Sequence, residues 1–329
     1  MKRTLLALAC STLFVGAAHA EYSIYGLLDG SIGKSIPDAQ AKERVGFHSG
    51  GDSDSGQGNS TTRIGVKGST DVGSGIKANF KFETGGITSG GDVKLEGRDV
   101  NGNPVRGPFF NRQAWFGVSG SMGEVRLGRQ DSVPFQTFIG YDLNGASNGV
   151  SAWGYSGVAT SHFARQSASL QYLSPSFGGV TAQAGLQLKN KADKAAGGKD
   201  VVSGAVTYAT GGLSLTGTFQ SKEGTGGDDF FGVFGSYGFG IVKLSLGYQD
   251  AKTTKGMFAG AQVTVADINI GAIYAAQTKN AAGKGSVIEL FVNKEILKGT
   301  YAYAEAGIAD KKVSGGKGTG YAVGVIYTF

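Results

Sequence analysis

Basic side chains recur on the polar faces of segments in which every second residue is apolar. In residues 76–83, Lys77 and Lys81 share one face with Asn79 and Glu83, while apolar residues occupy the other face. Several cations gathered on one face attract small anions. The chemistry that these residue types support is therefore electrostatic attraction.

Residues suited to catalysis or metal binding are scarce. The only histidines after residue 20 are His48 and His162, both in segments expected to be loops, and the single cysteine is Cys10. A nucleophile needs a base within hydrogen-bonding reach, and neither histidine is placed to serve one. Without cysteines after Cys10, a thiolate metal site is excluded from the rest of the chain. We expect no enzymatic activity, no metal and no cofactor.

The composition favours strands over helices. Of 329 residues, 58 are glycine, and 17% of the chain is charged, whereas soluble domains average about 7% glycine and about 25% charge. Glycine destabilises helices but suits short turns between strands. Hydrophobic residues make up 40% and aromatic residues 10% of the chain, which argues against disorder. The composition therefore predicts an all-β protein.

The N-terminus has the organisation of a secretory signal peptide. Lys2 and Arg3 precede the apolar residues 4–15, and Ala-His-Ala at 18–20 fits a cleavage site. No later stretch of 18 apolar residues is present that would form a transmembrane helix. We therefore expect an exported protein whose leader is removed, with one domain over residues 21–329.

Alternation of apolar and polar residues predicts strands with one apolar and one polar face. In 180–189, for example, Val180, Ala182 and Ala184 oppose Thr181 and Gln183. Nearly every such segment is long enough to cross a bilayer at a tilt. Sixteen strands are expected, near residues 22–34, 60–69, 75–84, 111–120, 123–130, 164–173, 179–189, 200–209, 212–221, 228–238, 241–251, 257–265, 268–278, 286–294, 299–310 and 319–329.

The connectors between these strands are alternately short and long. Turns such as 210–211 and 239–240 are short, whereas the longest polar connector spans residues 131–163. This alternation is typical of outer-membrane barrels. A soluble sandwich is the weaker interpretation, because its core could not bury the many charges of the polar faces. We therefore predict an all-β fold, a sixteen-stranded antiparallel transmembrane β-barrel with a water-filled lumen.

Four segments together resemble the Gram-negative general porins, particularly the trimeric sixteen-stranded porins of β-proteobacteria. They are YSIYGLLDGSIGK (22–34), TTRIGVKGSTDVGSGIKANFKFETG (61–85), NRQAWFGVSGSMGEVRLGRQ (111–130) and the C-terminal IYTF. The resemblance implies a channel for passive diffusion of ions and small hydrophilic solutes. It also implies that the third extracellular loop, at 131–163, folds into the barrel and narrows it.

The same resemblance assigns a basic cluster to the wall that faces this loop. Arg63 in TRIGVKG, Arg112 in NRQAWFG and Arg165 in FARQSASLQY match the family's positions. Alternation independently places Arg63 and Arg165 on polar faces, whereas the placement of Arg112 on the lumen wall is implied by the resemblance alone. Lys77 and Lys81, on the polar face of a neighbouring strand, complete the expected cluster.

The acidic side of the constriction is sparse in this sequence. The loop lacks the Pro-Glu-Phe-Gly turn of enterobacterial porins and offers only Asp131 and Asp142 as acids. A basic ring in a narrow pore raises the local concentration of anions, so we expect the channel to prefer anions. The alternative is that the basic residues merely solvate the wall and are neutralised by lumenal acids.

The resemblance also implies partners. The expected assembly is a homotrimer surrounded by outer-membrane lipid and lipopolysaccharide. The terminal Phe329 resembles the signal read by the barrel assembly machinery, and Glu21 and Phe329 should meet where the first and last strands close the barrel. Nucleic acid is not expected as a partner, because the basic residues are spread around the barrel.

Two other functions remain open from the sequence. A substrate-specific channel for a sugar would need aligned lumenal aromatic residues, and one for an oxyanion would need more than three arginines. A surface adhesin or antigen barrel would be marked by longer and more hydrophobic loops. Channel activity of the purified protein separates the adhesin from both kinds of channel.

Overall fold

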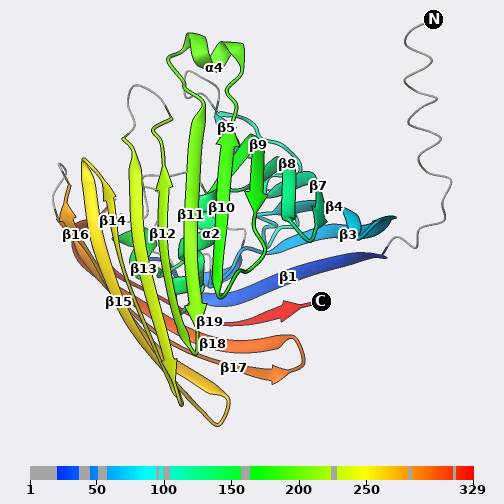
Figure 1. The fold of residues 1–329 in the computed structure, drawn as a ribbon. Helices are drawn as coiled ribbons and strands as arrows, with labels where there is room; N and C mark the ends of the chain where they lie inside the picture. The colour runs from blue at the N-terminus through cyan, green and yellow to red at the C-terminus, as the bar shows by residue number, and fades with distance from the viewer. Residues whose placement is uncertain are drawn as a thin grey trace, which may run out of the picture.

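The computed structural model describes residues 21–36, 45–50, 58–93, 96–98, 104–156, 164–223, 228–280, 284–313 and 316–329. The expected leader, residues 1–20, and residues 157–163 of the long connector lie outside the described residues. Within the described ranges, antiparallel strands curve into one closed barrel (Figure 1).

Sixteen long strands form the barrel wall, as the alternation predicts. They are β1 (Glu21–Lys34), β3 (Arg63–Gly73), β4 (Ile76–Gly85), β7 (Gln113–Gly120), β8 (Gly123–Asp131), β9 (Arg165–Leu173), β10 (Val180–Gln187), β11 (Val201–Thr210), β12 (Leu213–Gln220), β13 (Phe230–Phe239), β14 (Val242–Ala251), β15 (Thr254–Val265), β16 (Ile268–Lys279), β17 (Ser286–Leu297), β18 (Thr300–Val313) and β19 (Gly316–Thr328). Three short strands accompany them, β2 (Gly46–Ser49), β5 (Glu96–Arg98) and β6 (Pro104–Arg106).

The barrel closes between its first and last strands. Residues 27–34 of β1 pair with residues 321–328 of β19. On its other side β1 pairs with β3 through residues 21–27 and then with β2 through residues 30–33. Closure satisfies the strand edges internally, which a lipid environment requires because it offers no water to hydrogen-bond.

The two faces of the wall differ in polarity along each strand. In β14, Leu244 and Leu246 are exposed on the outside, whereas Ser245 and Gln249 are buried on the inside. The apolar side chains thus form an outer surface suited to lipid, and the polar ones line the lumen.

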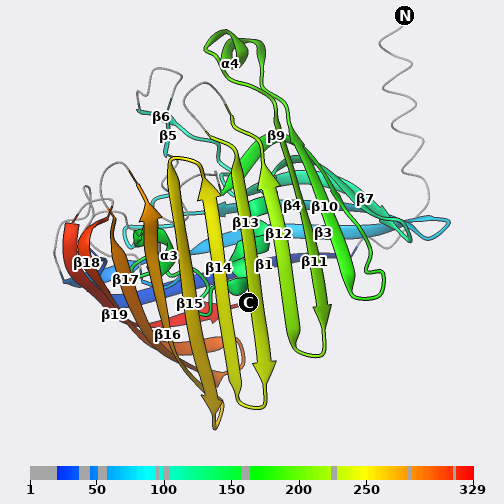
Figure 2. The same ribbon diagram turned by 60° about the vertical axis from the view of Figure 1, so that its left-hand side comes forward.

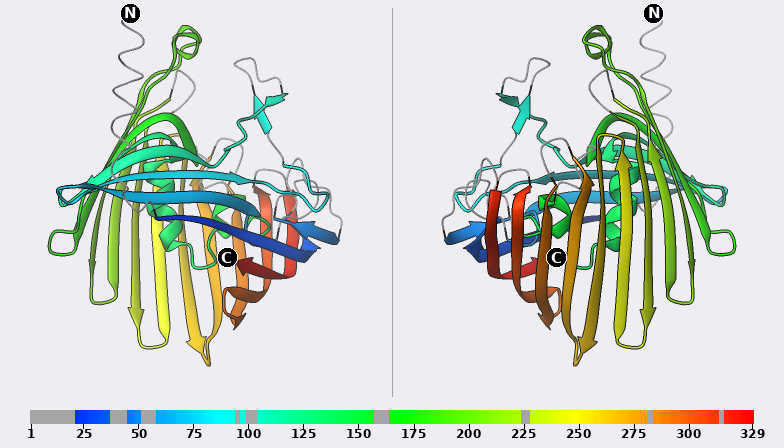
Figure 3. Two further views of the ribbon diagram at one scale, coloured as in Figure 1. Left: turned by 90° about the vertical axis from the view of Figure 1, so that its right-hand side faces the viewer. Right: turned by 90° about the vertical axis from the view of Figure 1, so that its left-hand side faces the viewer.

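Helical segments of the long connector lie inside the barrel (Figure 3). They are α2 (Val133–Phe138), η1 (Ile139–Tyr141) and α3 (Ala152–Tyr155). Helix α2 packs against β10, β11 and β12, and α3 packs against β16, β17 and β18. A fourth helix, α4 (Lys191–Ala195), stands between β10 and β11 at the end of the barrel (Figure 2). In the described part of the chain, no helix has the length and apolarity needed to cross a membrane.

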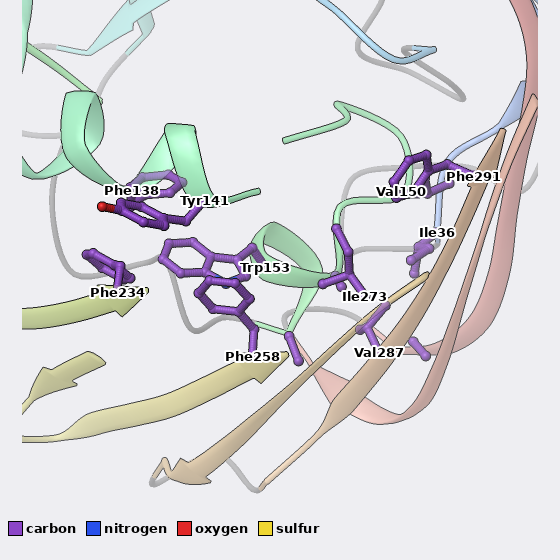
Figure 4. Packing of buried hydrophobic residues seen from close by; sticks show 13 residues of the cluster. Ile36, Phe138, Tyr141, Val150, Trp153, Phe234, Phe258, Ile273, Val287 and Phe291 are labelled. Atoms are coloured by element: carbon purple, nitrogen blue, oxygen red, sulfur yellow. The ribbon is translucent and has the colours of Figure 1, made fainter. Parts of the chain in front are cut away.

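An aromatic cluster fixes the connector to the inner wall. The ring of Trp153 stacks on Phe138 with centroids 4.3 Å apart and meets Phe258 of β15 edge-on at 4.8 Å. Figure 4 shows Trp153 between these residues, with Phe234 of β13 beside them. Because Trp153 is 1% exposed, its burial ties the connector firmly to this side of the lumen.

Candidate ion-conducting site

Arg63 and Arg112 reach the lumen beside Gly85. Arg63 pairs with Gly85 across β3 and β4, and its guanidinium donates to Ser60 Oγ at 3.2 Å and to the Thr61 carbonyl at 3.0 Å. A Cβ atom on Gly85 would lie 2.4 Å from Cδ of Arg112 and 3.3 Å from Cβ of Arg63. The absence of a side chain at Gly85 therefore leaves the space in which Arg112 lies.

Glu83 binds three of the side chains that surround it on this part of the lumen wall. Its Oε1 accepts a hydrogen bond from Nε of Arg112 at 2.5 Å, and its Oε2 accepts one from the Tyr25 hydroxyl at 2.8 Å. Nζ of Lys81 lies 3.7 Å from the same Oε2. This pairing turns the side chain of Arg112 toward the lumen. Phe116, four residues later and therefore expected on the same face of the strand, instead faces outward and is 62% exposed.

Arg165 joins the cluster from β9. Its Nε lies 2.9 Å from Oδ1 of Asp131, and its guanidinium sits 4.9 Å from the ring centre of Phe135 on α2. It is close enough to Arg112 for the two charges to repel each other. The structure thus brings together the three arginines that the family resemblance assigns.

Arg165 does not share a strand face with Ser169 and Gln171, as alternation predicts. The register of β8 and β9 shifts so that Arg129 alone stands opposite Ser167 and Ala168, and Ala168 has a φ of 51°. A bulge of this kind reverses the faces beyond it, so Gln166 is buried and Ser167 is exposed on the outside. Arg165 therefore reaches the lumen from the end of β9 and not by strand parity.

Lys81 belongs to the cluster, but Lys77 does not. Lys77 pairs with Asp71 and Ser119 near the opposite end of β4. It lies eight positions from Gly85, or about 27 Å at the usual rise of a strand. The prediction that Lys77 belongs to the cluster is therefore wrong. Alternation along a strand predicts the face on which a residue lies, but it does not predict the position of that residue along the pore.

The two acids of the connector differ in their surroundings. Asp131 ends β8 and is paired with Arg165. Asp142 is 8% exposed, its Oδ1 accepts the backbone N–H of Asn144 at 2.9 Å, and burial raises its pKa. Asp142 thus lies on the connector, where the sequence places it, but its side chain is buried and offers little of its charge to the lumen.

Acids on the far wall bind the connector and do not face the arginines. Glu289 accepts the backbone N–H of Ala152 and the amide of Asn144, both at 2.7 Å. Glu305 accepts the hydroxyl of Ser147 at 2.8 Å. Both carboxylates are buried, at 0% and 5% exposure, so they act as anchors for the connector. Sequence patterns place these acids in the lumen but carry no signal for their partners on the connector.

The chain ends are placed differently from the expectation. Phe329 exchanges two backbone hydrogen bonds with Gly26, at 3.0 and 3.2 Å. Glu21 lies five residues before Gly26 in β1, and it stands opposite Ser69 of β3 in the strand register. The first and last strands close the barrel as predicted, but Glu21 and Phe329 do not meet.

One lumenal cation of this wall, Lys67, was not predicted from the sequence as a residue of the site. Lys67 of β3 stands directly opposite Lys81 of β4, and both ammonium groups lie over the ring of Tyr25, at 5.3 and 5.4 Å from its centroid. The cross-strand register, which the hairpin turn at residues 74–75 sets, is the signal that would have found this pair.

A closed barrel with an apolar outside, a polar lumen, a basic inner wall and a connector packed inside defines a transmembrane diffusion channel. The chain matches the family described as Gram-negative porin over residues 4–329. It belongs to that family, and it is an outer-membrane channel and not an enzyme.

Relatives and solved structures agree with this assignment. The chain is 33% identical over 269 residues to outer membrane porin protein 32 of Delftia acidovorans, covering 77% of this chain and 70% of the relative. It is 30% identical to an outer membrane porin protein of Bordetella pertussis, over 81% of this chain and 73% of the relative. The anion-selective porin from Comamonas acidovorans superposes with a TM-score of 0.74 at 24% identity, covering 94% of this chain and 100% of that one.

Proposed function

We propose that this porin prefers anions and that Arg63, Arg112 and Arg165 control the preference. Among the described residues, two carboxylates, Glu83 and Asp131, lie within 4.0 Å of the cationic groups of these arginines and Lys81, and this excess of positive charge is the observation that carries the proposal. Cations therefore outnumber anions at this level of the wall. A net positive wall in a confined, partly desolvated pore concentrates anions and repels cations.

The position of the connector supports the same conclusion. Helices α2 and α3 cover the wall from β10 to β12 and from β16 to β18, while the arginines project from β3, the start of β7 and β9. In the part of the connector that the structure describes, the helices pack mainly on these other strands, which leaves the basic wall beside the path of hydrated ions. The acids of the covered wall, Glu289 and Glu305, are screened from the path by the connector that they bind.

The remaining assignments rest on the family. The similar porin from Comamonas acidovorans is described as anion-selective, in line with the proposal made for this chain. Removal of residues 1–20, assembly as a homotrimer, contact with lipopolysaccharide and insertion by the barrel assembly machinery through Phe329 are proposals of the same kind.

Ion selectivity tests the proposal. The zero-current potential of the purified protein is measured in a planar bilayer under a KCl gradient, for the wild type, for the triple variant R63Q/R112Q/R165Q and for K77Q. The wild type should be anion-selective, and the triple variant should lose most of that preference. K77Q removes one lumenal cation far from the cluster, so it should behave like the wild type. An unchanged potential in the triple variant would contradict the assignment.

A further inference from the structure

A short segment directly before β3, residues 58–62, lies against the connector. The carbonyl of Gly58 accepts the backbone N–H of Gly149 at 3.0 Å. The carbonyl of Asn59 accepts the backbone N–H of Asn148 at the same distance. The connector is therefore hydrogen-bonded to the chain that leads into β3 as well as to the far wall of the barrel.

Asn59 joins this segment to both the connector and the wall. Its side-chain amide donates to Oδ1 of Asn144 on the connector at 3.1 Å and to Oε2 of Glu305 on β18 at 2.9 Å. Its backbone N–H donates to the Tyr303 hydroxyl at 3.0 Å. The Glu305 carboxylate is buried, and a buried carboxylate needs hydrogen-bond donors. The amide of Asn59 supplies one without adding a charge.

The same segment holds the side chain of Arg63. The guanidinium donates to Ser60 Oγ at 3.2 Å and to the Thr61 carbonyl at 3.0 Å. Arg112 is close enough to repel it, and Glu83, which attracts it, is already bound to Arg112 at 2.5 Å. Among the described residues, no carboxylate lies within 4.0 Å of Arg63. The two uncharged oxygens of the segment therefore fix the direction in which Arg63 points.

Two further contacts set the position of these oxygens. The side-chain amide of Asn148 on the connector donates to Thr61 Oγ1 at 3.2 Å. The backbone N–H of Ser60 donates to Oδ2 of Asp29 on β1 at 2.5 Å. A shift of the connector would thus move the groups that accept hydrogen bonds from Arg63.

We propose that Asn59 is a positioning residue of the selectivity filter, which ties Arg63 to the connector through residues 58–62. Its amide is turned to Asn144 and Glu305, so it acts through Arg63 and not by contact with a permeating ion. The inference rests on the proposed anion preference and deepens it. The connector then does more than narrow the pore, because it also sets the place of one filter charge.

The test compares the permeability ratio of chloride to potassium, from zero-current potentials in planar bilayers under a KCl gradient. R63Q removes one unit of wall charge and should lower the ratio about fourfold. N59A leaves the net charge unchanged but loosens Arg63, so the ratio should fall by a smaller factor, about twofold. N59A/R63Q should equal R63Q alone, because the effects of two residues that act through one group are not additive.

A matched control and a second variant accompany N59A, with folding checked by the heat-modifiable mobility of the barrel. Asn79→Ala is the control, because the amide of Asn79 also donates to a carboxylate, that of Glu124 at 3.1 Å, but lies outside residues 58–62. N79A should keep the wild-type ratio. N148A removes the bond from the connector to Thr61 and should lower the ratio in the same direction as N59A, which gives an independent test if N59A does not fold.

The outcomes separate this role from the proposed function. Folded N59A and N148A channels with the wild-type ratio would overturn the positioning role and leave the filter assignment intact. An N59A effect of the same factor in R63Q as in the wild type would also overturn it, because Asn59 would then act without Arg63. A cation-selective wild type, or a wild-type ratio in R63Q, would instead refute the proposed function and with it this inference.

Discussion

Glu83 is the residue at which one substitution should strengthen the channel's anion preference. Its carboxylate is bound to Arg112, to the Tyr25 hydroxyl and, at longer range, to Lys81. Replacing Glu83 with Gln removes one negative charge but keeps an oxygen that can accept the Tyr25 hydrogen bond. It also leaves Arg112 without the carboxylate that neutralises it. The fixed charge of the wall thus becomes more positive by one unit.

The size of the effect follows from the position of Glu83 beside the ion path. A unit charge about 6 Å from a permeating ion contributes about 0.4 kcal/mol at the dielectric constant of water, after screening at 0.1 M salt. That energy raises anion occupancy about twofold and lowers cation occupancy about twofold, since about 1.4 kcal/mol corresponds to a factor of ten. The permeability ratio of chloride to potassium should therefore rise about fourfold in E83Q.

The assay is the zero-current potential under a KCl gradient, with folding checked by the heat-modifiable mobility of the barrel in gel electrophoresis. Glu124→Gln is the matched control, because Glu124 is also lumenal but pairs with Ser119 near the other end of β7. E124Q should shift the potential in the same direction by a smaller amount. A folded E83Q channel with unchanged or reduced anion preference would refute the reasoning that the local charge at Arg112 and Arg63 sets the selectivity.

Three further predictions concern the connector and the closure of the barrel. Trp153→Ala should lower the thermal midpoint and increase current fluctuations, since truncating a buried aromatic costs about 3–5 kcal/mol and Trp153 is 1% exposed; a quiet channel of wild-type stability would count against its anchoring role. Burial raises the pKa of Asp142, so ionisation opposes the native packing and its cost grows as pH rises from the unfolded pKa to the folded one. The gain in thermal midpoint on Asp142→Asn should therefore be larger at pH 8 than at pH 4, and an equal gain at both would contradict the sign. Deleting Phe329 should reduce the folded fraction recovered from outer membranes, because two backbone hydrogen bonds to Gly26 are lost, and an undiminished yield would show that closure does not depend on it.

The strands could be predicted from the sequence because their signal is local. Alternation over eight to ten residues defines each face, and all sixteen long strands appear where the pattern places them. The bulge in β9 could not be predicted in this way. Ala168 adopts a φ of 51° without a glycine or asparagine to announce it, so the faces of Ser167 and Gln166 are reversed from the simple pattern.

The candidate site was predictable only in part, because its geometry depends on contacts between distant residues. Parity gives the face of a lysine, but only the register shows that Lys77 lies far from Gly85 and that Lys67 stands opposite Lys81. The seating of the connector depends on bonds such as Glu289 to Ala152, across 137 residues. No local pattern encodes such a bond, so the burial of Asp142 was missed for the same reason.

The measurement that tests the account most directly is the zero-current potential of the wild-type protein in a planar bilayer under a KCl gradient. The arrangement of Arg63, Arg112 and Arg165 around Glu83 and Asp131 predicts a potential of the sign for anion selectivity. A potential of the opposite sign would mean that carboxylates govern the ion path, and it would contradict the assignment of the basic wall as the filter.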